Sequence, residues 1–227
     1  MSTLVALVGL LIGNLLNLIV DRQSVTEEHP LAPPRASFVD WIPIVGSVRR
    51  RDWVALAVEL ATGLMAVALF RKYGVSGRGL ALFGGSLVLI NTGAVDFRIR
   101  MIYTGEMVVA TLLALALAPV TGIGWLSSML GLATALGLFI FLFLLAKMLF
   151  RGHAAPFGLG DVYLAAFIGA LVGFLALPTA LFYGMLLAGV VALALILLRA
   201  AGRDVPTYIA YGTYLCLGVL LFLVTQA

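Results

Sequence analysis

Long apolar runs separated by short polar segments make up most of the chain. A membrane-spanning helix needs roughly 20 predominantly apolar residues, and the runs are continuous, without the alternation of a lipid-facing strand. The candidate spans cover residues 3–20, 53–70, 79–95, 105–120, 124–149, 162–177, 179–198 and 206–225. This pattern predicts an all-α fold, a polytopic membrane helix bundle with about eight transmembrane helices.

The composition narrows the function classes further. The 227 residues are 63% hydrophobic and 11% charged, whereas soluble domains are about half apolar and about a quarter charged, so a water-soluble globular domain is excluded. The single cysteine, Cys216, excludes an internal disulfide framework and a cysteine-based metal cluster. The formal charge of +4 comes from arginines and lysines that mostly lie between apolar runs. We therefore expect membrane lipids, and not nucleic acid, as partners.

Lysines and arginines also set the orientation, because cytoplasmic loops are enriched in them. With the N-terminus outside, the outer loops carry only Arg71, Lys72 and Arg78. The inner segments then carry Arg22, Arg35, Arg49, Arg50, Arg51, Arg98, Arg100, Lys147, Arg151, Arg199 and Arg203. This bias predicts that both termini lie outside and that residues 21–52 form a cytoplasmic loop. The loop contains Pro30, Pro33 and Pro34 and is predicted to be largely irregular.

Two of the few acidic residues fall at the cytoplasmic edge of predicted spans. Asp96 ends one apolar run, and Asp161 opens another 65 residues later, directly after Gly158-Leu159-Gly160. Two carboxyl groups that meet where water is scarce can share one proton. One can then act as general base on a water while the other polarises a peptide carbonyl. Gly158 and Gly160, which have no side chain, are candidates for binding a substrate through their backbone.

Simpler interpretations fit the same residues. Asp161 is also placed to cap a helix, and Asp96 is placed to pair with Arg98 or Arg100. A buried ion pair, or the proton-relay carboxylates of a small proton-coupled transporter, would use the same residue types. Glu59 and Glu106 lie near the cytoplasmic ends of predicted spans and are expected to be boundary residues whose side chains reach toward water. Most of the remaining acidic residues, in the first and last cytoplasmic loops, are expected to be solvated surface residues.

Five segments, in the same order along the chain, resemble the bacterial type IV prepilin peptidases, which are Gly-x-Gly-Asp membrane aspartyl proteases related to the archaeal preflagellin peptidases. The segments are Gly9-Leu10-Leu11-Ile12-Gly13-Asn14-Leu15-Leu16-Asn17, Asp40-Trp41-Ile42-Pro43, Val58-Glu59-Leu60-Ala61-Thr62-Gly63, Asp96-Phe97-Arg98-Ile99-Arg100-Met101-Ile102 and Gly158-Leu159-Gly160-Asp161-Val162. Gly169 and Gly173 stand at the family's following glycine positions. The resemblance implies that Asp96 and Asp161 are the catalytic pair.

The resemblance also implies a substrate, a location and a domain organisation. It implies removal of the basic leader from type IV prepilin or pseudopilin-like precursors, at the cytoplasmic face of the bacterial inner membrane. Residues 1–75 correspond to a reduced methyltransferase-like region and residues 76–227 to a six-span peptidase core. A non-catalytic pilin-binding assembly factor is the other alternative that the resemblance leaves open.

The first loop departs from the family, because it lacks the two Cys-x-x-Cys pairs that bind zinc in bacterial members. We therefore expect no metal. We expect no N-methyltransferase activity either, although Asp40 and Glu59 remain as possible remnants of that region. S-adenosylmethionine would be a cofactor only if methyl transfer is retained, and proteolysis by two aspartates needs none.

Overall fold

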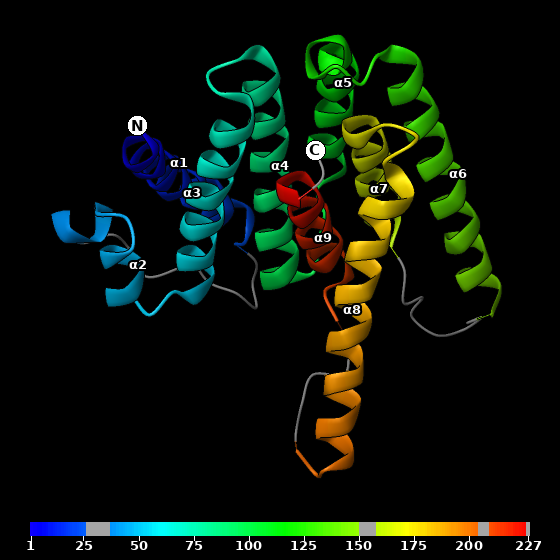
Figure 1. Ribbon diagram of the computed structural model, residues 1–227. Coiled ribbons are helices and arrows are strands. Elements are labelled where there is room, and N and C mark those ends of the chain that lie inside the picture. Colours follow the sequence, from blue (N-terminus) through cyan, green and yellow to red (C-terminus); the bar gives the residue numbers. More distant parts are fainter. Residues whose placement is uncertain (26–36, 150–157, 204–208, 226–227) are drawn as a thin grey trace. The chain divides into compact units, whose positions relative to one another are not determined.

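The computed structural model describes residues 1–25, 37–149, 158–203 and 209–225 (Figure 1). The elements in these residues are all helical, which confirms the all-α prediction. The predictions for Arg35, Arg151, the prolines of the first loop and residues 206–208 concern parts of the chain outside the described residues. The helices are α1 (Ser2–Gln23), η1 (Phe38–Trp41), α2 (Val45–Arg49), α3 (Trp53–Tyr73), α4 (Gly77–Ile99), α5 (Thr104–Thr121), α6 (Trp125–Leu149), α7 (Leu159–Val172), α8 (Leu177–Ala200) and α9 (Tyr211–Thr225).

Six of these helices are long and apolar enough to cross a bilayer, namely α1, α3, α4, α5, α6 and α8. The other two predicted spans correspond to α7 and α9, which have only 14 and 15 residues. At 1.5 Å per residue α7 measures about 21 Å, less than the roughly 30 Å of the hydrocarbon core. The apolar run that predicted a span at 162–177 passes through Gly173, whose φ of +78° ends the helix. The chain is a multi-pass membrane protein with six spans of full length in its described part.

The chain divides into two compact units, Met1–Met101 and Ile102–Ala227. In the first unit α3 packs between α1 and α4. Small residues allow α1 and α3 to approach closely, as is typical of helix pairs in membranes. A Cβ on Gly9 would lie 2.8 Å from the Cβ of Ala66, and a Cβ on Gly13 would lie 2.8 Å from the Cα of Glu59. α4 thus packs with the N-terminal helices in the first compact unit.

The segment between α1 and α3 contains two short helices, η1 and α2, in a loop predicted to be largely irregular. A polar side chain on α1 holds this segment, although the two are far apart in the sequence: Asn14 Nδ2 donates a hydrogen bond to the backbone oxygen of Trp41 at 2.6 Å. α2 begins after Ile44, which has a φ of +68°. A β-branched residue is strained in that region. The loop conformation therefore depends on contacts with the membrane helices.

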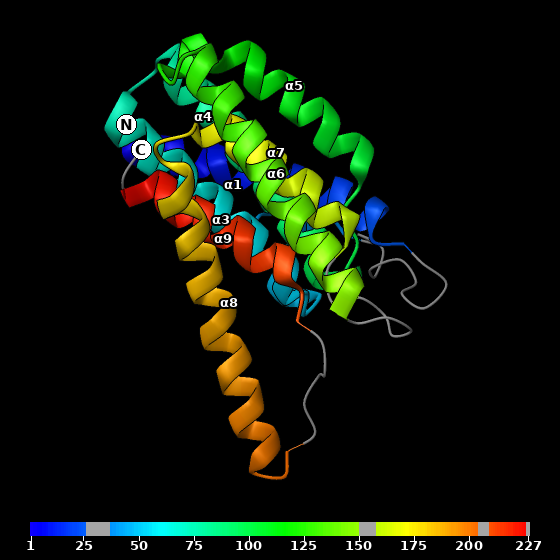
Figure 2. The ribbon, with the colours of Figure 1, turned by 90° about the vertical axis from the view of Figure 1, so that its right-hand side faces the viewer.

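In the second unit α7 is the central helix, and its residues from Leu164 to Val172 are all buried. It packs mainly against α5 and α6. The α6–α7 contact is made by Gly131 and Gly169, where each glycine lies against the backbone of the other and leaves no room for a Cβ. Gly184 and Gly218 make a similar close contact between α8 and α9. The second half of α8 extends beyond the start of α9 (Figure 2).

Candidate active site

Asp96 lies in the last turn of α4, within the first unit, and its side chain is buried. The helix ends at Ile99, and the next residue, Arg100, adopts the left-handed conformation and donates its N–H to the backbone oxygen of Asp96 at 2.8 Å. The turn that precedes it, Asn91 to Val95, is buried as well. Asp96 is therefore held on a rigid, capped helix end, and not on a loop.

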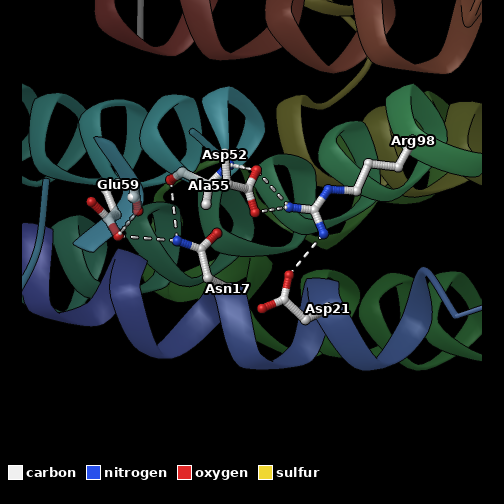
Figure 3. A network of polar contacts seen from close by, with 7 residues as sticks. Asn17, Asp21, Asp52, Ala55, Glu59 and Arg98 are labelled. Carbon is white, nitrogen blue, oxygen red and sulfur yellow. Dashed lines mark hydrogen bonds and ion pairs between the residues drawn. The ribbon is translucent and has the colours of Figure 1, made fainter. Parts of the chain in front are cut away.

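The pairing of Asp96 with Arg98, one of the simpler interpretations of the sequence, is not what the structure shows. Arg98 Nη1 donates to Asp21 at the end of α1 at 2.7 Å, and Arg98 Nη2 contacts both oxygens of Asp52 at 2.8 and 3.0 Å (Figure 3). All three side chains are only 12–15% exposed. Arg98 thus ties together the ends of α1 and α4 and the start of α3, so these three helices alternate in direction.

We expect Arg98→Gln to lower the free energy of unfolding of the protein in detergent by about 3 kcal/mol, because it leaves two partly buried carboxylates side by side without a counter-charge. Adding Asp21→Asn to Arg98→Gln should recover part of the loss, since one of those charges is then removed. Arg100→Gln, an exposed arginine two residues further on, is the matched control and should change stability by less than about 0.5 kcal/mol. Equal losses for Arg98→Gln and Arg100→Gln would contradict this role.

Asp161 lies in the first turn of α7, within the second unit, and is partly exposed. Its Oδ2 accepts a hydrogen bond from the N–H of Gly158 at 3.1 Å. Asp161 therefore caps the start of α7, as one of the simpler interpretations proposed, although from inside the first turn. A capping role uses one carboxylate oxygen and does not by itself exclude Asp161 from a reaction.

The two glycines before Asp161 have different surroundings. A Cβ on Gly160 would lie 2.8 Å from the Cβ of Ile102, closer than side chains tolerate. A Cβ on Gly158 would meet only Asp161 Oδ2 at 3.7 Å and Gly160 N at 3.8 Å, which are ordinary contacts. Gly160 thus allows the start of α7 to lie directly against Ile102. Gly158 is exposed, so of the two it is the better placed to offer its backbone to a substrate.

A matched pair of alanine substitutions tests this difference. Gly160→Ala should reduce any activity that depends on Asp161 by about tenfold or more, because the added methyl group displaces the start of α7 or Ile102. Gly158→Ala should retain activity within about twofold, since its methyl group has room. The measurement is the initial rate for each purified variant, with melting temperature as the control for folding. If Gly158→Ala lowered the rate and Gly160→Ala did not, the close packing would be required at Gly158 and not at Gly160, and the prediction would be wrong.

The two residues predicted as possible methyltransferase remnants, Asp40 and Glu59, are both buried and engaged. Glu59 accepts a hydrogen bond from Asn17 Nδ2 at 3.2 Å (Figure 3). It also accepts hydrogen bonds from Ser47 Oγ at 2.7 Å and from the N–H of Ile44. Its side chain is therefore not a boundary carboxylate reaching toward water. Asp40 Oδ2 accepts from the N–H of Ser37 at 2.9 Å. Each carboxylate holds part of the segment between α1 and α3.

Tyr211, the first residue of α9, was not predicted from the sequence as a site residue. Its hydroxyl group lies close enough to Asp161 to interact electrostatically with that carboxylate. The starts of α7 and α9 are thus neighbours within the second unit. A tyrosine at the start of an apolar run gives no signal of this in the sequence, since it is also typical of the membrane interface.

Asp96 and Asp161 belong to different units, so their approach to one another remains a prediction about how the units pack. No group of three or more histidine, cysteine, aspartate or glutamate side chains suited to a metal ion occurs among the described residues. Comparison with known proteins gives no match: no family model fits the chain, and neither a curated protein nor a solved structure is significantly similar to it.

Proposed function

We propose that the chain is a membrane-embedded aspartyl endopeptidase that removes the basic leader from type IV prepilin-like precursors at the cytoplasmic face of a bacterial inner membrane. The observation that supports this most is the contact between Gly160 and Ile102. Ile102 follows Asp96 by six residues, and Gly160 directly precedes Asp161. The chain that leaves one aspartate therefore runs against the residue next to the other.

The length of α7 supports a recessed position for Asp161. Because α7 is about 21 Å long and largely buried in protein, it does not need to reach both surfaces of a roughly 30 Å hydrocarbon core. We place its start, and with it Asp161, slightly below the headgroups, where a carboxylate is surrounded by less water. α9, with 15 residues, is similarly short, and it starts near Asp161. This arrangement fits a scissile bond at the boundary between a polar leader and an apolar helix.

In the proposed reaction, the ionised member of the pair takes a proton from a water molecule, and the protonated member donates a hydrogen bond to the peptide oxygen. The water oxygen forms a bond to the peptide carbon, and the tetrahedral intermediate breaks at the carbon–nitrogen bond. A carboxyl group passes the proton to the leaving amine. The products are the leader, with a new carboxyl end, and the mature protein, with a new amino end.

The direct test is cleavage of a synthetic precursor by the protein reconstituted in liposomes. A precursor with a basic leader followed by an apolar helix should be shortened by the mass of the leader. A precursor whose leader has been removed should stay intact. If the precursor with its leader also stays intact, or binds without being cut, the endopeptidase proposal is wrong. Solute uptake driven by a pH gradient, without cleavage, would instead favour the transporter.

A further inference from the structure

The segment between α1 and α3 carries three consecutive arginines, Arg49, Arg50 and Arg51, directly before the membrane-spanning helix α3. The guanidinium nitrogens of Arg50, Nε, Nη1 and Nη2, are all buried, and none has a hydrogen-bond partner in the described part of the chain. A guanidinium group carries five N–H donors. Leaving such a charge buried and unpaired is among the costlier arrangements in a protein.

Four of the described carboxylates of the same unit have other partners. Asp21 and Asp52 bind Arg98, Glu59 accepts hydrogen bonds from α1 and from the loop, and Asp40 lies 3.9 Å from Arg49. None of these four carboxylates binds Arg50, whose guanidinium nitrogens have no acceptor in the described part of the chain. Its guanidinium favours a planar or tetrahedral oxyanion, which it binds through two parallel hydrogen bonds.

The surroundings of Arg50 indicate where that oxyanion comes from. Apolar side chains on both sides of the arginines are exposed, among them Trp41, Val45, Val48 and Trp53. Trp53 is the first residue of α3, so Arg50 lies three residues before the start of a span. Tryptophan side chains are enriched at the level of the lipid headgroups, and adjacent arginines attract anionic lipids. Exposed apolar side chains beside a cationic group match a lipid better than a soluble anion.

We propose that Arg50, with Arg49 and Arg51, forms a binding site for the phosphate of an anionic phospholipid, and that the exposed tryptophans and valines contact the acyl chains of the same leaflet. The bound phosphate supplies the acceptor that Arg50 lacks. Residues 37–52 then lie on the membrane surface, and their structure depends on the lipid composition. This site does not depend on the proposed peptidase activity.

The test measures the melting temperature of the full-length protein in neutral detergent, with phosphatidylglycerol or phosphatidylcholine added. Phosphatidylglycerol near 100 times its Kd should raise the melting temperature of the unmodified protein by about 5–10 °C, and phosphatidylcholine should not. Arg50→Gln should remove most of this increase. Without anionic lipid, Arg50→Gln should melt at the same temperature as the unmodified protein or higher, because it removes an unpaired buried charge.

Arg71→Gln is the matched control, since it removes an exposed arginine from the opposite end of α3, and it should keep the response to phosphatidylglycerol. An equal increase with inorganic phosphate alone would show that the ligand is a soluble anion and overturn the lipid site. A lower melting temperature of Arg50→Gln in every condition would show an internal partner, for example Glu27 or Glu28, and also overturn it.

Mass spectrometry of the intact protein gives a second measurement that needs no variant. After incubation with equal amounts of the two lipids, the unmodified protein should retain phosphatidylglycerol at least about tenfold in excess over phosphatidylcholine, the ratio expected for a charge-assisted pair. Equal retention of both lipids would overturn the proposal.

Discussion

Asparagine in place of either Asp96 or Asp161 should reduce cleavage of a precursor by about 10²–10⁴-fold, the range that a positioned general acid or base contributes. Each substitution keeps the size and polarity of the side chain but removes its ability to accept or donate a proton. Because the two groups act on one water, the double variant should be little slower than either single variant. The measurement is the initial rate of leader removal in liposomes, followed by mass.

Asparagine also separates catalysis from helix capping at Asp161. The side-chain oxygen of asparagine accepts a hydrogen bond from the N–H of Gly158 as the carboxylate does, and asparagine and aspartate are similarly good caps. A residue that only caps α7 would therefore tolerate Asp161→Asn, with activity and melting temperature preserved. Loss of activity at an unchanged melting temperature is expected only if the carboxyl group takes part in the reaction.

Glu106→Gln provides the matched control, because Glu106 occupies the first turn of α5 as Asp161 occupies the first turn of α7. It removes one carboxylate from the same unit and should leave the rate within about twofold, as is usual for a residue outside the reaction. If Asp96→Asn or Asp161→Asn retains a substantial part of the rate, the assignment of the catalytic pair is wrong.

The positions of the long helices could be predicted from the sequence because a membrane span is a local property, set by the length of an apolar run. The run at residues 53–70, for example, became α3, Trp53–Tyr73. At α7 the helix is shorter than the apolar run for a local reason: the run continues past Gly173, but the positive φ of that glycine ends the helix at Val172. Hydropathy does not record backbone conformation, so a buried helix of 14 residues resembles a full span.

The polar contacts could not be predicted, because their partners are far apart in the sequence. Arg98 pairs with Asp21 and Asp52, which are 77 and 46 residues away, and not with the neighbouring Asp96. Likewise, the short helices of the first loop are held by Asn14 and Glu59 on membrane helices. The sequence identified Asp96 and Asp161 as unusual from their place at the ends of apolar runs, and their relative position depends on how the two units pack.

Glu59→Ala should lower the free energy of unfolding by about 3–5 kcal/mol, because it leaves several buried hydrogen-bond donors without an acceptor. Asn17, Ser47 and the N–H of Ile44 would each lose an acceptor. Ile44 has a positive φ, and without the hydrogen bond from its N–H nothing in the network compensates that strain. Glu59→Gln keeps one acceptor oxygen and should cost about 1–2 kcal/mol.

Glu59→Ala should also loosen the loop between η1 and α3. Trypsin should therefore cleave at Arg49, Arg50 and Arg51 several times faster in this variant than in the unmodified protein. Leu60→Ala, at the exposed position that follows, is the control and should change neither the melting temperature nor the tryptic rate appreciably. If Glu59→Ala keeps both properties but abolishes a methylation detectable by mass, Glu59 acts in methyl transfer and its hydrogen bonds to the loop are not what stabilises it.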